Sequence, residues 1–301
     1  MGILMFGEVV WDDITEKGGS GKPEHLGGAP LNVAVHSARL GVPSAVCSSL
    51  GRDPLGDQTV EALKGLPVDT QLVARNRWET CLIKVQFGED GEPAYHIPED
   101  VSWDHITVSD SGWDRVKEYL CLYYGSLALR NNESRNTVKR LLERGGFSHV
   151  FCDVNLRPPF YSVETLDFCL QNCDIAKLNE QELLTISQLF SVPGNSLEGA
   201  MRGVMAHFHL ERLVVTLGSS GCAYLDGPHF GLVPGLQVCV KDPVGAGDGF
   251  CAGLLAGLEQ GSSLKEACVL GNQLGAFIAT QVSSIPVYTK KGFDDWRGRY
   301  V

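Results

Sequence analysis

Asp242-Pro243-Val244-Gly245-Ala246-Gly247-Asp248 stands directly before an apolar run, Gly249–Leu258, that is typical of a helix. Two glycines and an alanine leave the backbone bare where this helix is expected to begin. An anion can bind there, because first-turn N–H groups lack partners and the helix dipole favours negative charge. Asp248 closes the stretch, and beside a bound phosphate its carboxylate is suited to accept a proton from an attacking hydroxyl. The simpler alternative is a glycine-rich turn with an acidic residue in the first helical turn, which is common.

On either side of this stretch, strand-like apolar runs alternate with helical patterns. The expected strands are Ile3–Phe6, Ser44–Leu50, Tyr119–Tyr124, His149–Val154, Asp174–Leu178 and Arg212–Leu217. The expected helices are Leu31–Leu40, Gln58–Leu63, Glu133–Glu143, Val163–Cys169, Glu180–Phe190, Leu197–Phe208 and Leu264–Thr280. This alternation predicts βαβ units and a mostly parallel sheet. The length allows one large α/β domain or two smaller ones.

One region breaks the alternation. Trp78–Phe87 and Ala94–Ile97 flank Gly88-Glu89-Asp90-Gly91-Glu92, which is a hairpin signal. We interpret this hairpin as a small β lid outside the main sheet, with Asp13–Leu26 as its other side. The apolar segment Thr80–Phe87 has an edge to cover, and we therefore expect a homodimer through the lid.

Composition excludes several classes of partner. The chain has 301 residues, 44% hydrophobic and 20% charged, with a formal net charge of −11. Such a surface repels nucleic acid and anionic membranes, so an anionic substrate must be held by local groups. No run reaches the length of a membrane span, and the first residues lack the basic segment of a signal peptide.

Cysteine spacing argues against disulfides and zinc. Of ten cysteines, eight lie singly in apolar runs, where a free thiol acts as a small hydrophobe. These eight are Cys47, Cys81, Cys121, Cys152, Cys222, Cys239, Cys251 and Cys268. Cys169 and Cys173 are one helical turn apart, but no second ligand pair follows. We therefore expect a reducing, cytoplasmic location.

Two further tracts suit a polyol. Gly27-Gly28-Ala29-Pro30 allows close approach to the backbone, and Asn32 follows one turn into a helix, able to donate and accept hydrogen bonds. Asp12 is expected at the C-terminal end of an apolar strand, the edge where open α/β sheets bind ligands. A simple strand-to-helix turn and a turn acid are the structural alternatives.

Two other strand ends carry polar or glycine-rich turns. Asn179-Glu180-Gln181-Glu182 reads as a capping box, or as residues that steer Mg²⁺-bound water. Thr216-Leu217-Gly218-Ser219-Ser220-Gly221 is suited to receive a nucleotide, with Thr216 bonding a phosphate. The sequence has neither a P-loop nor a dinucleotide fingerprint at its first strand.

In this order, the motifs resemble the PfkB (ribokinase-like) carbohydrate kinase family over nearly the whole chain, and bacterial fructokinases most. The resemblance also includes Gly7-Glu8, Gly51-Arg52-Asp53-Pro54-Leu55-Gly56 and Asp153-Val154-Asn155-Leu156-Arg157-Pro158. It implies a single three-layer α/β/α domain over residues 1–301, with a mostly parallel sheet and a lid from about 13–26 and 78–97. The implied reaction is ATP- and Mg²⁺-dependent phosphorylation of a sugar primary hydroxyl, D-fructose giving fructose 6-phosphate.

The resemblance assigns roles residue by residue. Asp248 matches the catalytic base, and the backbone of Gly245, Ala246 and Gly247 matches the anion hole. The matching sugar-site residues are Asp12, Gly28, Asn32 and, as in some sugar-acid kinases, Arg157. The matching nucleotide-site residues are Asn179, Thr216, Gly218, Gly221 and Asn272, and Glu182 matches the residue linked to magnesium through water.

Alternatives within and outside this class stay open. Arg157 suits an acid such as 2-keto-3-deoxygluconate, and ribose or a nucleoside is a further candidate substrate. A non-catalytic sugar-binding regulatory protein is the alternative of another class. The resemblance also implies K⁺ at Asp242, but Pro243 replaces the usual threonine and the turn Gln281–Pro286 has no glycine. The sequence therefore leaves the potassium site open.

Overall fold

The computed structural model describes residues 2–15, 25–87 and 93–300. A nine-stranded sheet runs through its centre in the order β13-β12-β11-β10-β9-β8-β1-β4-β5. The strands are β1 (Ile3–Phe6), β4 (Ser44–Gly51), β5 (Asp69–Asn76), β8 (Cys121–Gly125), β9 (His149–Asp153), β10 (Ile175–Asn179), β11 (Arg212–Thr216), β12 (Gly221–Asp226) and β13 (His229–Pro234). From β11 to β5 all neighbours run parallel, whereas β12 runs antiparallel to β11 and β13 antiparallel to β12.

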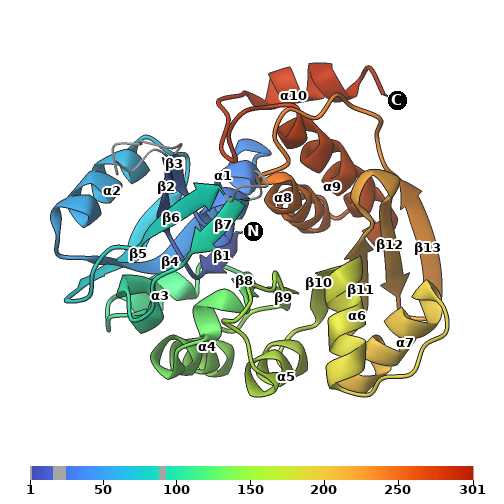
Figure 1. The fold of residues 1–301 in the computed structure, drawn as a ribbon, viewed down its shortest axis with the longest axis horizontal. Coiled ribbons are helices and arrows are strands. Elements are labelled where there is room, and N and C mark those ends of the chain that lie inside the picture. The colour runs from blue at the N-terminus through green and yellow to red at the C-terminus, as the bar shows by residue number, and fades with distance from the viewer. Residues whose placement is uncertain (1, 16–24, 88–92, 301) are drawn as a thin grey trace.

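Helices cover both faces of this sheet (Figure 1). One face carries α1 (Ala29–Arg39), α8 (Ala246–Glu259) and α9 (Leu264–Ala279), with α10 (Lys290–Arg297) outside them. The other carries α3 (Gly112–Val116), α4 (Asn132–Arg144), α5 (Val163–Gln171), α6 (Glu180–Leu189) and α7 (Leu197–Phe208), and α2 (Pro54–Lys64) lies near the β5 end. Short 3₁₀ turns are η1 (Ser102–His105), η2 (Leu127–Leu129) and η3 (Gly218–Ser220). Each face has its own apolar core, so the three-layer α/β/α architecture expected from the sequence is confirmed.

A separate four-stranded sheet lies near α1, β1 and β4 (Figure 1). Its order is β3 (His25–Gly27), β2 (Val10–Thr15), β6 (Leu82–Phe87) and β7 (Pro93–His96). β6 and β7 pair antiparallel, which confirms the hairpin expected around Gly88–Glu92. The turn itself and most of the segment 13–26 lie outside the described residues.

Two details of this small sheet differ from expectation. Asp12 lies within β2, paired with His25, rather than at the end of a main-sheet strand, because β1 ends at Phe6. The strand expected from Trp78 begins only at Leu82, since Trp78 instead stacks on His105 with ring centroids 3.5 Å apart. β6 also lies between β2 and β7, so its edge is covered within the sheet.

Glycines let α8 and α9 approach closely. A Cβ on Gly253 would lie 2.7 Å from the carbonyl oxygen of Leu270, and one on Gly271 would lie 2.9 Å from that of Phe250. α9 begins with a capping box, in which Ser263 and Glu266 satisfy each other's backbone N–H groups. This packing fixes the direction of α8, whose first turn carries Gly247 and Asp248.

Solvent exposure follows the apolar pattern for nine of the ten cysteines, which are buried as free thiols. Cys239 is the exception: it lies exposed between β13 and α8, so its expected burial is wrong. None of the helices in the described part of the chain has the length and apolar character needed to cross a bilayer.

Candidate active site

A cavity of about 740 Å³ opens at the carboxyl ends of β10 and β11, against α8 and α9. Its wall includes all five residues that the sequence matched to a nucleotide site, Asn179, Thr216, Gly218, Gly221 and Asn272. Ala246 and Gly247, from the first turn of α8, lie on the same wall. The glycine-rich turn after β11 and the glycine-rich start of α8 are therefore two sides of one cavity.

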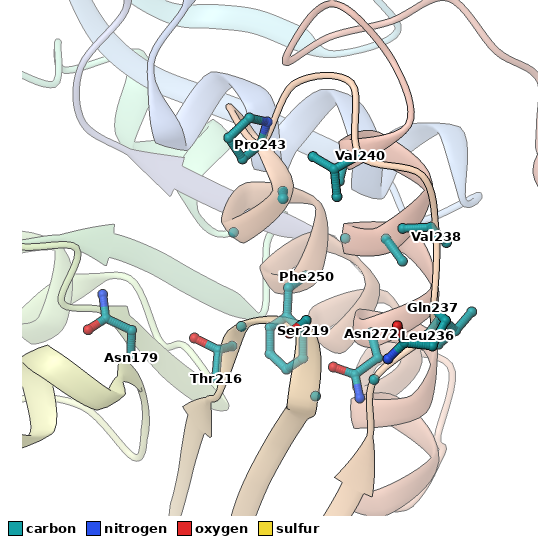
Figure 2. A pocket seen from close by; sticks show the side chains of 18 of the residues that line it. Asn179, Thr216, Ser219, Leu236, Gln237, Val238, Val240, Pro243, Phe250 and Asn272 are labelled. Carbon is teal, nitrogen blue, oxygen red and sulfur yellow. The ribbon is translucent and has the colours of Figure 1, made fainter. Parts of the chain in front are cut away.

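Polar side chains lie at both ends of this cavity. Figure 2 shows Asn272, Leu236 and Gln237 at one end and Asn179 at the other, with Thr216 between them. Asn272 is fixed because its amide donates to the carbonyls of Val233 and Pro234 at 3.2 Å. A volume in this range with few, converging polar groups is typical of a small-molecule site.

The loop before α8 is a tight turn held by its own residues. Ala246 donates its N–H to the carbonyl of Pro243 at 3.1 Å, and Gly245 has φ +82° and ψ −5°, the third position of a type II turn. The Asp242 carboxylate accepts the N–H of Val244 at 2.9 Å. Because Ala246 uses its N–H in this turn, the first-turn groups left for an anion come from Gly247 and Asp248.

Asp248 is linked to α1 by a side-chain hydrogen bond. The amide nitrogen of Asn32 donates to Asp248 Oδ2 at 2.7 Å. Asn32 is 5% exposed, and its buried Oδ1 has no hydrogen-bond partner within the described residues. Burial raises the pKa of Asp248 to about 6, partly offset by the hydrogen bond from Asn32. An unpaired buried acceptor beside a carboxylate suits a ligand that brings its own hydroxyl group.

Backbone geometry keeps the segment before Asn32 close to the loop after β1. Gly28 has φ +108°, and a Cβ there would lie 2.3 Å from the carbonyl oxygen of Glu8. Only glycine fits such a contact. Burial raises the pKa of the neighbouring Glu8 carboxyl to about 7, although the Arg157 charge lowers it. Glu8 belongs to the quoted family motif Gly7-Glu8, but nothing in the sequence around this single acidic residue predicts that it is buried.

Arg157 acts on the Asp248 carboxylate, whereas Asp12 belongs to the small sheet. Arg157 is exposed and donates to the carbonyl of its neighbour Leu156, while its charge lowers the pKa of Asp248. Asp12 is half-buried on β2, and burial raises the pKa of its carboxyl to about 6. The described contacts pair Asp12 with His25 within the small sheet and give it no hydrogen bond to Asn32 or Asp248.

The tract at the start of α6 forms the capping box that was its structural alternative. Asn179 Oδ1 accepts the N–H of Glu182, and Glu182 Oε2 accepts that of Asn179, both at 2.8 Å. Glu182 Oε1 also accepts the N–H of Leu156 at 2.9 Å. Glu180, not Glu182, lies on the cavity wall with Asn179. Among the described residues no three His, Cys, Asp or Glu side chains gather as a metal cluster.

The carbonyl oxygens around Asp242 already accept hydrogen bonds from protein groups. Its carboxylate orders the loop, and the Ala279 carbonyl accepts N–H groups of Lys241 and Asp242. The carbonyl of Ser284 bonds the His36 ring at 2.8 Å, and that of Pro286 accepts from the Arg39 guanidinium at 2.6 Å. A potassium ion at these oxygens would lie beside protein donors, one of them the Arg39 guanidinium, which disfavours the potassium site.

With this geometry in view, the family is clear: residues 18–291 match the pfkB family of carbohydrate kinases, and the chain belongs to it. The chain is therefore a carbohydrate kinase of this family.

Among its relatives, the sugar kinase PH1459 of Pyrococcus horikoshii is 32% identical over 85% of this chain and 82% of its own length. Probable fructokinase-5 of Arabidopsis thaliana is 28% identical over 94% and 93%. The crystal structure of PH1459 in complex with ATP superposes with a TM-score of 0.81 over 96% of both chains, at 29% identity. Fructokinase of Vibrio cholerae O395, in a form with bound fructose, ADP and calcium, gives 0.79 over 97% of both chains, at 25% identity.

Proposed function

We propose that this chain transfers the γ-phosphoryl group of ATP to the primary hydroxyl of D-fructose, giving fructose 6-phosphate. One observation carries the proposal. The wall of the cavity that the five nucleotide-site residues line also includes Ala246 and Gly247, which stand immediately before Asp248, the carboxylate that Asn32 holds. A triphosphate lying along this cavity brings its last phosphoryl group to the first turn of α8, between the nucleotide and the base.

Each group has a task in this reaction. The N–H groups of Gly247 and Asp248 hold the transferred phosphoryl group as its oxygens gain charge. Asp248 takes the proton from the sugar hydroxyl as its oxygen attacks phosphorus. The unpaired Oδ1 of Asn32 accepts a hydrogen bond from a sugar hydroxyl, and Asp12 accepts further ones.

Magnesium fits at the end of the cavity where Asn179 lies. Asn179 and Glu180 offer oxygen atoms there, and Mg²⁺ keeps most of its waters when it binds nucleotides. Bound to the phosphates, the ion neutralises part of their charge. Glu182 acts on magnesium indirectly, because its capping hydrogen bonds hold Asn179 in position.

The small sheet β3-β2-β6-β7 is proposed to close over the sugar as a lid, which excludes water and limits ATP hydrolysis. Its outer strands β3 and β7 leave edges on which a second copy can pair. Light scattering checks this dimer, and a monomer at working concentration contradicts it.

A sugar panel tests the substrate. ADP release from ATP and Mg²⁺ is measured with fructose, glucose, ribose, 2-keto-3-deoxygluconate and a nucleoside, with sugar binding followed by calorimetry. We expect the highest kcat/KM with fructose. Preference for 2-keto-3-deoxygluconate would instead assign Arg157 to a substrate carboxylate. Sugar binding without ADP release for any compound would identify a binding protein that has kept the fold.

A further inference from the structure

A buried ion pair lies in the central sheet and takes no direct part in the proposed reaction. Lys177 Nζ is 3.0 Å from Asp153 Oδ1, and the two residues are register partners on β10 and β9. Their side chains are only 6% and 1% exposed. Inside a sheet such a pair seldom adds stability over apolar residues, because both charges lose their water. Its presence therefore needs a reason other than packing.

The pair sits directly beneath the first turn of α8. A Cβ on Gly247 would have the Lys177 ammonium nitrogen 3.9 Å away as its nearest neighbour. One turn further along α8, Cys251 Sγ donates to Asp153 Oδ2 at 3.2 Å. The hydroxyl of Tyr123 on β8 donates to the same oxygen at 3.3 Å. These contacts place Lys177 behind the backbone that we assign to the anion hole.

This position is electrostatically unfavourable without a ligand. The N-terminus of a helix carries partial positive charge, and cations there repel it. Burial opposes the charged form of Lys177, yet Asp153 and the more distant Glu182 raise the pKa of Lys177 above its ordinary value. The ammonium group is therefore charged at neutral pH. The positive end of the helix dipole and the ammonium group repel each other and together form one positive region. A negatively charged phosphoryl group that binds at the first turn would offset this repulsion.

We infer that Lys177 is a positioning residue for phosphoryl transfer: its buried charge strengthens the start of α8 as an anion site. The inference rests on the proposed function, since it assigns the transferred group to that turn. It gives Asp153 the task of holding the ammonium group in place. Asp153 also acts on Asp248, whose pKa it raises by more than Lys177 lowers it. The other charged or titratable groups that act on Asp248 or Lys177 are Glu8, Arg157, Glu182, Tyr123 and Cys251.

The test separates charge from packing. Lys177→Met alone leaves Asp153 buried without its partner and is expected to unfold at lower temperature. The double variant Lys177→Met with Asp153→Asn removes both charges and is expected to regain most of this stability. Its kcat with the preferred sugar is nevertheless expected to stay at least about tenfold below wild type, because the positive region is lost. The matched control is Arg212→Met with Asp226→Asn, an ion pair of the same sheet away from the cavity, with unchanged kcat expected.

A second readout concerns the pH profile. Lys177 lowers the pKa of Asp248, so Lys177→Met alone, measured where it is folded, is expected to move the acidic limb of kcat/KM to higher pH. Asp153 raises the same pKa by more, so loss of both charges is expected to move the limb of the double variant to lower pH. A double variant with wild-type kcat overturns the inference and leaves Lys177 as a packing residue. If wild type itself phosphorylates no compound of the panel, the proposed function fails, and nucleotide binding decides the inference separately. If the double variant binds ATP more weakly than wild type but binds AMP equally well, the inference is supported. If the double variant binds ATP as tightly as wild type does, the inference is contradicted.

Discussion

The amide of Asn32 donates to the carboxylate of Asp248 at 2.7 Å, across 216 positions of sequence. The contact joins α1, which begins beside the small sheet, to α8, which begins beside the nucleotide cavity. It orients the carboxylate and stabilises its charged form, which lowers the pKa that burial raises. One hydrogen bond thereby connects the part of the site proposed to bind the sugar with the part proposed to bind the phosphates.

Removal of this bond is expected to change the pH dependence of turnover. The base must be ionised, so activity in wild type rises with pH through about 6, the pKa of Asp248. In Asn32→Leu that pKa increases, so a larger share of activity is lost at pH 6 than at pH 8. The kcat/KM profile from pH 5 to 9 measures the shift. An acidic limb at the wild-type position would show that another group controls it.

Asp248→Asn keeps the shape of the side chain but cannot take a proton. We expect kcat to drop by at least about 100-fold, the lower range for a general base, while the sugar still binds. Steady-state ADP release and calorimetry measure the two effects. Asp295→Asn, on the exposed face of α10, serves as the control with full activity. Near-normal turnover in Asp248→Asn would remove Asp248 from the reaction.

Gly245 and Gly261 form a natural pair of test positions. Both have positive φ, +82° and +84°, but a Cβ on Gly245 would lie 2.7 Å from Ser284 whereas one on Gly261 meets nothing within 4 Å. Alanine at Gly261 is expected to cost about 1 kcal/mol of stability through backbone strain alone, with kcat unchanged. Alanine at Gly245 also displaces the turn before α8, so kcat decreases. Thermal unfolding and kcat separate the two effects, and equal kcat in both variants contradicts the role of the turn.

Stability below neutral pH depends on His36. Its Nε2 bonds the Ser284 carbonyl at 2.8 Å, its Nδ1 bonds Tyr288 Oη at 2.9 Å, and burial lowers its pKa from 6.5 to about 4. Between these values the unfolded chain binds a proton that the folded chain does not, so stability falls as pH decreases from 6.5 toward 4. His36→Gln keeps one donor and one acceptor without titrating. The stability difference between wild type and His36→Gln should shift by about 2 kcal/mol from pH 8 to pH 5 in favour of the variant. Denaturant unfolding at both pH values measures it, and a constant difference contradicts the shifted pKa.

Monovalent cations are expected to leave turnover unchanged. Donors from α1 and from the loop at Asp242 occupy the carbonyls of Ala279, Ser284 and Pro286. Rates measured in potassium, sodium and tetramethylammonium chloride at equal ionic strength should agree. Selective activation by potassium would mean that the loop rearranges to release these oxygens.

The strand-end motifs could be located from sequence because each combines a local backbone signal with a chemical one. Glycines after β11 and before α8 mark places where a chain must turn and where a ligand can approach, and the parallel sheet brings such ends together. The capping box of α6 could be predicted from the sequence because Asn and Glu three positions apart at a helix start are a local signal. Neither signal contains the distance between Asn32 and Asp248, which only the packing of α1 on α8 sets.

Other features lacked a readable pattern. Asp12 was placed on the wrong strand because the short loop after Phe6 leads directly into β2, and nothing in the apolar run separates the two strands. β12 and β13 were missed, since their alternation is brief and follows a turn already given to the nucleotide. Lys177 is a single charge inside the buried run Ile175–Leu178. A lysine in such a run is itself a signal, but its partner Asp153 lies on another strand.

The separation of 216 positions between Asn32 and Asp248 also bears on how the enzyme is made. Contacts between residues so distant along the chain form late in folding, because closing the long loop between them costs entropy before the contact can stabilise the fold. During synthesis α1 leaves the ribosome well before α8 and its carboxylate exist. A partly made chain therefore lacks Asp248, the proposed base, so on this proposal phosphoryl transfer has to wait until α8 has been added.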